Sequence, residues 1–372
     1  MNRILRIAVD AHPLTNPRNG IGRYTSNVLC EFALLHSPHP IYLYSDRPFQ
    51  LDFPLPAHWK VRTGSVRFHI PSTAFAQAIF PVWALKDGIN VFWSPRPQFP
   101  LLLPPRIRKV LTVHDLVLKR YPQTMRRIGR VIETLLMPLS LRIADQVIAD
   151  SHFTRSELLT YFPCTGCKVN VVYLASSLRA GGTPGSCPVS SPYLLFVGSS
   201  EPRKNMRRML LAYLRYRNLS PDPHDLVIVG SNQWGDFDVP QFIQTHDLHT
   251  WVHLIQNVDD AVLSVLYQHA QALVLVSLYE GFGLPLVEAM QYGIPLIASN
   301  NSSVAEIAGN AAILVDPSDD DAIAQAFRTV TEDQAVRSEL AHNSAIRGLQ
   351  FSWKLAASET MSLVVGKFAE AR

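Results

Sequence analysis

The feature that most constrains this chain is the alternation of short apolar runs with longer segments of helical periodicity, repeated in two successive series. This alternation is typical of βαβ units, in which helices cover both faces of a parallel sheet. We therefore expect an α/β protein with two Rossmann-like domains. The predicted strands are Arg6–Asp10, Ile41–Ser45, Asn90–Trp93, Val110–Val113, Gln146–Ala149 and Lys168–Tyr173, then Tyr193–Val197, Leu226–Val229, Val252–Leu254, Ala272–Val276, Pro295–Ala298 and Ala312–Val315.

Composition predicts the domain boundary. Residues 175–192 are rich in Ser, Gly and Pro and separate the two series, as a linker does. The predicted domains are residues 1–175 and 176–351. Ligands of open α/β sheets bind outside the carboxyl ends of the strands, so we expect the site in a cleft between the domains. The predicted helices are Tyr24–Leu35, Thr124–Ile143, Phe153–Tyr161, Met206–Arg217, Ala261–His269, Leu286–Tyr292, Val304–Ala308, Asp320–Glu332 and a last helical segment within 352–372.

Overall composition narrows the functional classes. Hydrophobic residues make up 47% of the 372 residues and charged residues 17%, which supplies two cores and argues against disorder. The net charge of +4 is too small to predict a nucleic-acid partner. The apolar run before Asp10 contains Arg6 and is typical of a first strand rather than a secretory signal. The sequence contains no run of about 18 consecutive apolar residues, so it predicts no membrane-spanning helix.

The four cysteines are few and irregularly spaced, which favours a cytoplasmic protein with reduced thiols. Cys164 and Cys167 have CxxC spacing, but a structural zinc site needs four ligands and no second pair accompanies them. We therefore prefer a loop to a metal or redox site. The acidic run Asp319–Asp321 opens a predicted surface helix and does not follow a strand, so we expect no catalytic metal.

The strongest chemical motif runs from Glu280 to Glu288 and directly follows an apolar strand. Gly281 and Gly283 let the backbone approach a ligand closely, and Pro285 suits the first position of the next helix. Free amides at a helix N-terminus bind phosphate, so the motif predicts a diphosphate site. Glu280 in the loop and Glu288 in the first helical turn then contact different parts of one ligand. The alternative is an ordinary junction with a capping glutamate.

A second motif, Val197–Asn205, also follows an apolar strand. Arg203 and Lys204 stand at its strand-to-helix turn, where two cations can neutralise charge on a leaving diphosphate. The alternative is a solvated pair of charges on a loop. Because the glutamate motif lies in the same half of the chain, we favour a functional role.

His114 is a weaker candidate, since it follows a predicted strand of the first half and is expected to point into the cleft. A lone histidine is more often structural, and its neighbour Asp115 is a candidate cap for the next segment.

The predicted loop Asn19–Tyr24 is another weak candidate. It contains Gly20 and Gly22, but Thr25 replaces the third glycine of a dinucleotide fingerprint. Asp46 is the one acidic residue well placed at the end of the second predicted strand. The loop either donates amides to an anion or forms a structural turn.

The segment from Lys119 to Arg142 combines arginines with apolar residues at helical spacing. A basic, apolar helix can lie on an anionic membrane surface. Packing of this helix on its own sheet, with solvated arginines, is the alternative that we slightly prefer.

In this order, the motifs resemble the retaining glycosyltransferases of family four, the group-one family with the GT-B fold. The resemblance covers nearly the whole chain through NGIGRY, TVHDL, ADSHFTRSELL, LLFVGSSEPRKN, LVIVG and a final run from SLYEGFGLP to AAILVDP. That last run holds the family's two glutamates, separated by seven residues. The EPRKN variant resembles a subgroup of bacterial mannosyl- and rhamnosyltransferases of surface-polysaccharide assembly.

The resemblance implies a role for each matching residue. Arg203 and Lys204 would bind the donor diphosphate, and Glu280 would lie near the transferred sugar. Glu288 would bind the nucleotide ribose, and His114 would contact the sugar from the opposite domain. Further donor-binding candidates are Gly20, Gly22, Gly198, Asn257, Val258, Gly281, Phe282, Gly283 and Leu284. Ser199 and Ser200 stand where many relatives have an arginine, which leaves the division of labour between Arg203 and Lys204 open. The final helix would cross back onto the first domain.

The implied reaction moves a hexose from a nucleotide sugar to an acceptor hydroxyl with retention and without cofactor or metal. GDP-mannose is the preferred donor, and the acceptor would be a glycan or a polyprenyl-diphosphate-linked oligosaccharide at the inner face of the membrane. One alternative is rhamnosyl or glucosyl transfer from a dTDP- or UDP-sugar, and another is a non-catalytic nucleotide-sugar-binding protein. The missing third glycine disfavours a nicotinamide oxidoreductase.

Overall fold

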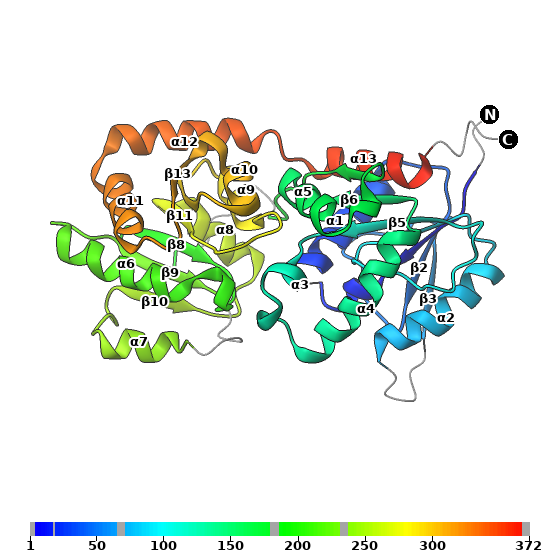
Figure 1. Ribbon diagram of the computed structural model, residues 1–372. Helices are drawn as coiled ribbons and strands as arrows, with labels where there is room; N and C mark the ends of the chain where they lie inside the picture. Colours follow the sequence, from blue (N-terminus) through cyan, green and yellow to red (C-terminus); the bar gives the residue numbers. More distant parts are fainter. Residues whose placement is uncertain (1–3, 18, 65–70, 179–185, 231–236, 367–372) are drawn as a thin grey trace. The chain divides into compact units, whose positions relative to one another are not determined.

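The computed structural model describes residues 4–17, 19–64, 71–178, 186–230 and 237–366. The chain forms two compact units, Met1–Leu174 with Ser352–Arg372, and Ala175–Phe351 (Figure 1). The predicted boundary after residue 175 lies one residue from this division. In the described residues no helix is long and apolar enough to cross a membrane.

The first unit is built on a seven-stranded parallel sheet with the order β3-β2-β1-β4-β5-β6-β7. Its strands are β1 (Ile7–Asp10), β2 (Ile41–Ser45), β3 (Lys60–Thr63), β4 (Val91–Ser94), β5 (Arg108–Val113), β6 (Gln146–Ala149) and β7 (Val169–Val171). Its α-helices are α1 (Gly20–Leu34), α2 (Ser72–Lys86), α3 (Val117–Arg120), α4 (Arg127–Ile143), α5 (His152–Tyr161) and α13 (Trp353–Val365).

Strand β4 shows how this sheet is buried on both faces. Successive strand residues point to opposite faces, and both Phe92 and Trp93 are fully buried. The Phe92 ring packs 6.4 Å from Phe80 of α2, whereas the Trp93 ring packs 5.7 Å from Phe32 of α1. Helices α1 and α2 therefore cover opposite faces, the arrangement expected of a doubly wound sheet.

The second unit has a six-stranded parallel sheet with the order β10-β9-β8-β11-β12-β13. Its strands are β8 (Tyr193–Val197), β9 (Asp225–Val229), β10 (Val252–Ile255), β11 (Ala272–Leu275), β12 (Leu296–Ser299) and β13 (Ala312–Val315). Its α-helices are α6 (Met206–Leu219), α7 (Val239–Thr245), α8 (Asp260–His269), α9 (Leu284–Gln291), α10 (Ser302–Ala308), α11 (Asp320–Glu332) and α12 (Gln334–Gly348). The acidic run opens helix α11, as expected, and Asp319 caps that helix by accepting from the amides of Asp321 and Ala322.

The strand order of each sheet reverses beside its first strand, between β1 and β4 and between β8 and β11. In open α/β sheets this switch point leaves a crevice at the carboxyl ends, where ligands bind. Both units thus confirm the predicted pair of Rossmann-like domains. The sequence prediction lacked β3, α2, α3, α7 and α12, and about half of the other element ends differ by one to four residues.

Candidate active site

The two strongest motifs meet at the switch point of the second sheet. Arg203 and Lys204 form a short 3-10 turn after β8, and Glu280 lies in the loop after β11. Because β8 and β11 are neighbours in the sheet, residues 76 positions apart come into contact. The structure thus brings these three candidate residues together, and their catalytic roles stay predictions.

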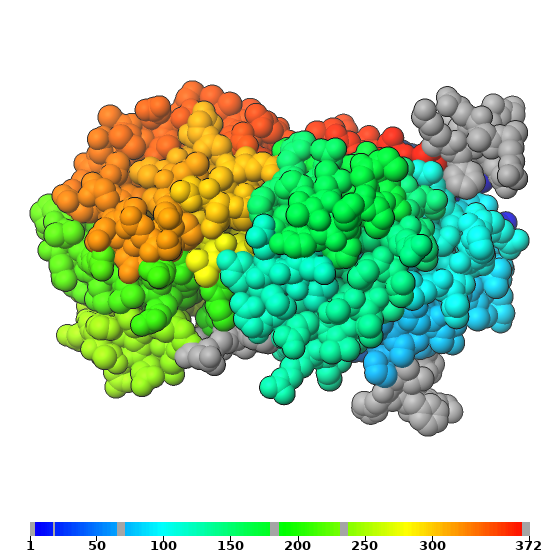
Figure 2. Space-filling view, viewed as in Figure 1, coloured from blue at the N-terminus to red at the C-terminus, as the bar shows by residue number. Residues whose placement is uncertain are grey.

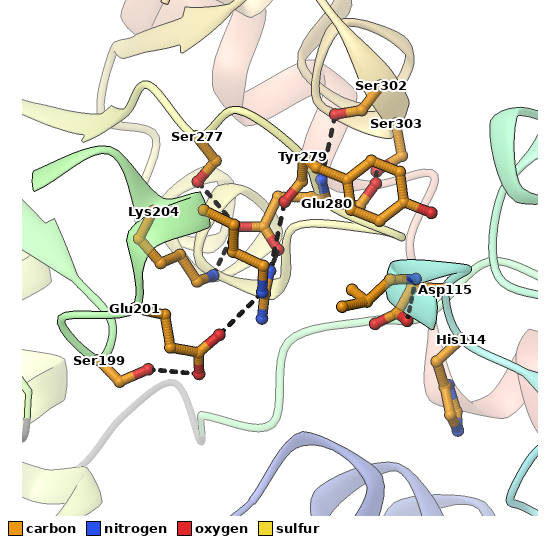
Figure 3. A network of polar contacts seen from close by, with 12 residues as sticks. His114, Asp115, Ser199, Glu201, Lys204, Ser277, Tyr279, Glu280, Ser302 and Ser303 are labelled. Atoms are coloured by element: carbon orange, nitrogen blue, oxygen red, sulfur yellow. Dashed lines mark hydrogen bonds and ion pairs between the residues drawn. The ribbon is translucent and has the colours of Figure 1, made fainter. Parts of the chain in front are cut away.

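Glu280 is the centre of this cluster and is almost fully buried, with 6% of its surface exposed. Its Oε1 accepts hydrogen bonds from Lys204 Nζ at 2.5 Å and from Ser277 Oγ at 2.8 Å, as Figure 3 shows. Its Oε2 accepts one from Arg203 Nη1 at 2.8 Å. Burial alone would raise the pKa of Glu280, but the two cations outweigh it and hold the pKa at about 2. The carboxylate therefore stays charged and fixes both cations.

Backbone contacts anchor both sides of the cluster. The amide of Leu278 donates to the carbonyl of Arg203 at 2.7 Å, which joins the two motif loops directly. Ser303 Oγ of α10 donates to the carbonyl of Glu280 at 2.9 Å, and the Glu280 amide donates to Ser302 Oγ (Figure 3). The cluster is thus held from three strand-to-helix junctions.

Glu201 adds a second carboxylate that the sequence analysis did not single out. Its Oε2 accepts from Arg203 Nε at 2.8 Å, and its Oε1 accepts from Ser199 Oγ at 2.8 Å (Figure 3). Glu201 is about one-third exposed, so its partnership with Arg203 is more easily exchanged than that of buried Glu280. Two carboxylates now balance the two cations that the sequence places at this turn.

Helix α9 presents its N-terminus close to Glu280, with Gly283 as its N-cap in a left-handed conformation (φ 94°). The first amides of a helix lack intrahelical acceptors, so this end suits a phosphate. Pro285 occupies the second helical position rather than the predicted first, and Phe282 packs edge-to-face on Phe351 at 6.0 Å.

Glu288 lies in the second turn of α9, not in the first as predicted, because the helix already begins at Leu284. It is buried, and its Oε2 accepts from the Tyr267 hydroxyl at 2.8 Å. The Tyr267 ring stacks on Tyr292 at 5.8 Å. The ribose-binding role of Glu288 stays a prediction.

A pocket opens beside the cluster at the carboxyl ends of β8, β9 and β10. A Cβ on Gly230 would lie 2.0 Å from the Gly198 carbonyl oxygen, so glycine is needed where these two strand ends meet. Asn257 and Val258 follow β10, and Asn257 has a left-handed backbone (φ 55°). The lining residues are Gly198, Ser200, Met206, Ile228, Gly230, Val239, Leu254 and Gln256. This largely apolar lining suits an aromatic base.

His114 follows β5, as predicted, but both its ring nitrogens have partners within the first unit. Nδ1 lies 2.6 Å from Asp150 Oδ2, and Nε2 lies 2.9 Å from the Pro95 carbonyl. Burial lowers the pKa of His114, yet the Asp150 charge and these contacts outweigh it and raise the pKa overall. Contact with a sugar through either nitrogen requires opening one of these bonds. Asp115 accepts from the amide of Val117, the first residue of α3, but Leu116 holds the N-cap position of that helix, so Asp115 is not its cap.

The predicted loop around Gly20 and Gly22 is wrong, because α1 already begins at Gly20. Asn19 caps the helix, and its Oδ1 accepts from the Gly22 amide at 2.6 Å. That amide is therefore unavailable to an anion. A Cβ on Gly22 would lie 2.3 Å from the Asn16 carbonyl oxygen, which gives this glycine a packing role.

The four cysteines are free, and Cys164 and Cys167 lie exposed in the 3-10 turn and loop between α5 and β7. Among the residues that the structure covers, no group of three or more His, Cys, Asp or Glu side chains is arranged to hold a metal ion. Metal independence of the reaction stays a prediction.

Two family models match the chain. One, described as Glycosyltransferase Family 4, matches residues 18–175, and the other, described as Glycosyl transferases group 1, matches residues 186–347. Together they span both units. The chain belongs to the group 1 glycosyltransferases.

Named relatives of this glycosyltransferase include the O-antigen chain mannosyltransferase B of Escherichia coli. The two sequences are 28% identical over 96% of this chain and 99% of that protein. Among solved structures, the sucrose-phosphate synthase of Thermosynechococcus elongatus superposes with a TM-score of 0.76 at 21% identity, over 99% and 100% of the two chains. WaaG, a glycosyltransferase involved in lipopolysaccharide biosynthesis, gives 0.72 at 13% identity, over 97% and 100%. These structures confirm the GT-B fold.

Proposed function

We propose that this glycosyltransferase moves a mannosyl group from GDP-mannose to a hydroxyl of a glycan acceptor, with retention of the anomeric configuration. The observation that carries the proposal is the buried Lys204–Glu280–Arg203 cluster beside the N-terminus of α9. It concentrates cationic donors and backbone amides where the diphosphate of a nucleotide sugar needs them.

The cluster supports catalysis because the charge to be stabilised develops on the departing diphosphate. Lys204 has three N–H donors, and the described residues accept one of them, so it retains donors for phosphate oxygens. Arg203 is held on one side by buried Glu280 and on the other by the more exposed Glu201. We propose that the diphosphate takes the place of Glu201, which leaves Glu280 to orient both cations.

In the proposed step, the bond between the sugar C1 and the diphosphate oxygen breaks, and a bond from the acceptor oxygen to C1 forms on the same face. The acceptor hydroxyl proton passes to the departing diphosphate, so no separate metal or cofactor is needed. Preorganised donors that need no reorganisation during the reaction are the main source of such stabilisation.

The choice of mannose rests on the name of the relative that matches over its full length, together with the EPRKN motif. We propose a glycan or polyprenyl-diphosphate-linked oligosaccharide of bacterial surface-polysaccharide synthesis as acceptor. Rhamnosyl or glucosyl transfer from a dTDP- or UDP-sugar is the alternative that a donor screen distinguishes.

Helix α4 supports a membrane-side location for this reaction. Large apolar side chains recur every three or four residues and are exposed, with Ile128 at 78% and Leu135 at 63%. They form one stripe opposite the buried face of α4, and exposed Arg126, Arg127 and Arg142 flank it. The whole stripe comprises Ile128, Val131, Leu135, Leu139 and Ile143. Helix α4 lies on the near side of the first unit in Figure 1, and Figure 2 draws the atoms of that same side. We propose that this stripe contacts an anionic bilayer.

The test is a thermal-shift screen with GDP, UDP, dTDP, ADP and CMP, each with matching sugar nucleotides, followed by transfer assays. We expect GDP and GDP-mannose to raise the melting temperature selectively. Lys204→Ala should lower kcat about 100-fold. The control is Arg208→Ala, which removes an exposed cation of the following helix α6 and should leave kcat unchanged. A shift only with UDP or dTDP forms would replace the donor. Wild-type turnover by Lys204→Ala would refute the mechanism.

A further inference from the structure

The carboxyl edge of the seven-stranded sheet carries a second histidine–aspartate pair that the motifs above do not use. His12 follows β1 and Asp46 follows β2, with His12 Nδ1 2.5 Å from Asp46 Oδ1. His114 and Asp150 stand in the equivalent relation after β5 and β6. The two pairs flank β4, the strand beside the switch point of this sheet.

The two histidines differ in whether a ring nitrogen is available to hydrogen-bond a ligand. Both nitrogens of His114 are taken by Asp150 and the Pro95 carbonyl. His12 uses only Nδ1, and within the described residues no hydrogen-bond partner lies at its Nε2. The His12 side chain is 25% exposed, against 16% for His114.

Asp46 fixes the protonation pattern of the His12 ring. It is almost fully buried, and its Oδ2 accepts from Ser72 Oγ at 2.7 Å and from Arg47 Nε at 3.1 Å. Burial alone would raise the pKa of Asp46, but the contacts from Ser72, His12 and Arg47 outweigh it and lower the pKa. A carboxylate only accepts hydrogen bonds, so the proton of a neutral His12 lies on Nδ1, and Nε2 carries a lone pair.

The backbone of His12 is also fixed. Its amide donates to Asp10 Oδ1 at 3.1 Å, and buried Asp10 is bound by Arg96 Nε at 3.0 Å. Arg96 comes from the loop after β4, across the switch point. The two carboxylates in contact with His12 therefore each have an arginine partner, Asp10 with Arg96 and Asp46 with Arg47. This charge balance favours a neutral, hydroxyl-bearing ligand over an anion.

We propose that His12 Nε2 accepts a hydrogen bond from a hydroxyl of the acceptor sugar, with Asp46 as the residue that positions its ring. The inference rests on the proposed function, since it assigns part of the acceptor subsite of a sugar transferase. Its ligand class is a neutral hexopyranoside, and its place is the switch point where open α/β sheets bind ligands.

The experiment compares His12→Asn with His12→Gln, because the two amides replace different ring nitrogens. The Asn amide reaches the place of Nδ1 and keeps the Asp46 contact, whereas the Gln amide reaches the place of Nε2. Transfer from the donor selected by the thermal-shift screen to methyl α-D-mannopyranoside is measured, alongside donor hydrolysis without acceptor and the melting temperature.

If His12 binds the acceptor, His12→Asn lowers kcat/KM for the methyl mannoside about tenfold, which is the change expected from the loss of one hydrogen bond in the transition state. Donor hydrolysis and melting temperature stay near wild type, and His12→Gln retains most of the transfer. If His12 is purely structural, the order reverses, and His12→Gln loses stability while His12→Asn keeps it. Equal transfer by both variants and wild type also overturns the proposal.

A second measurement needs no turnover. In full-length protein labelled with ¹⁵N-histidine, His12 should show the Nδ1–H tautomer, and methyl α-D-mannopyranoside should shift its Nε2 resonance while leaving His114 unchanged. An Nε2–H tautomer, or no response of His12 to the sugar, refutes the inference. Nucleotide binding in the thermal-shift screen is independent of His12, so failure of this proposal is distinguishable from failure of the proposed function.

Discussion

Replacing Glu280 by glutamine tests the electrostatic core of the site most directly. The change preserves size but removes the charge that pairs with Lys204 and Arg203. The pKa of Glu280 falls from its ordinary 4.5 to about 2 in the folded protein. At about 1.36 kcal/mol for each tenfold change in proton affinity, this lowering corresponds to about 3 kcal/mol of stability at neutral pH. Because the group is buried, little of this is lost to solvent screening.

The expected consequence is a fall in melting temperature of about 6 to 12 °C for a unit of this size. The sign of the pH dependence follows from the lowered pKa. The carboxylate's contribution is present above pH 4.5, the unfolded value, and is lost as the pH falls toward 2. Wild type and Glu280→Gln should therefore differ clearly at pH 7.5 and converge in acid.

Thermal melts followed by circular dichroism at pH 7.5 and pH 2.5 measure this difference, because the contribution of Glu280 is lost mainly between pH 4.5 and pH 2. Glu201→Gln is the matched control, since its carboxylate binds the same Arg203 but is about one-third exposed and should change stability by less than about 1 kcal/mol. If Glu280→Gln has the same melting temperature as the wild type at pH 7.5, the free-energy cost of burying the carboxylate equals the stabilisation from its ion pairs. The cluster would then contribute nothing to the stability of the fold.

Three further outcomes are expected. Glu201→Gln should tighten donor binding a few-fold by calorimetry, because it removes the charge that competes with diphosphate for Arg203; weaker binding would refute the proposed exchange. Gly230→Ala should lower both melting temperature and nucleotide affinity, because its Cβ would lie 2.0 Å from a carbonyl oxygen; unchanged values would contradict the packing at the pocket. Ile128→Ser with Leu135→Ser should reduce flotation with anionic vesicles at least tenfold without changing turnover on a water-soluble acceptor. Equal flotation of this variant and the wild type would exclude the α4 stripe as the membrane contact.

The buried strands were predictable from sequence because each is a short apolar run, and short apolar runs that alternate with helical segments are typical of buried parallel strands. Strand β3 was missed because it is an edge strand with mostly exposed side chains, and it therefore lacks an apolar run. Helix α2 was missed because its own apolar residues are spread over all of its faces, so they give no helical periodicity, and because Pro81 lies inside it. The start of α1 was misjudged because glycines in its first turn resemble a loop, although Asn19 caps it.

The residues of the site were predictable, but their pairing was not. Arg203, Lys204 and Glu280 stand in recognisable motifs, yet only the adjacency of β8 and β11 brings them together. Tyr267, the partner of Glu288, lies outside those motifs and carries no sequence signal of its own. His12 was overlooked although Asp46 had been noted, because a bond across 34 residues depends on the neighbouring strands β1 and β2.

Helix α13 gives the first unit an unusual order of assembly. The helix packs on α1, where Trp353 lies 6.2 Å from Tyr24, and Arg108 of β5 donates to the Leu363 carbonyl. The first unit thus contains the first strand and the last described helix of the chain. During synthesis from the N-terminus, the second unit leaves the ribosome whole while the first still lacks a helix. The first unit is begun first and finished last, so a truncation near the C-terminus damages the half that was made earliest.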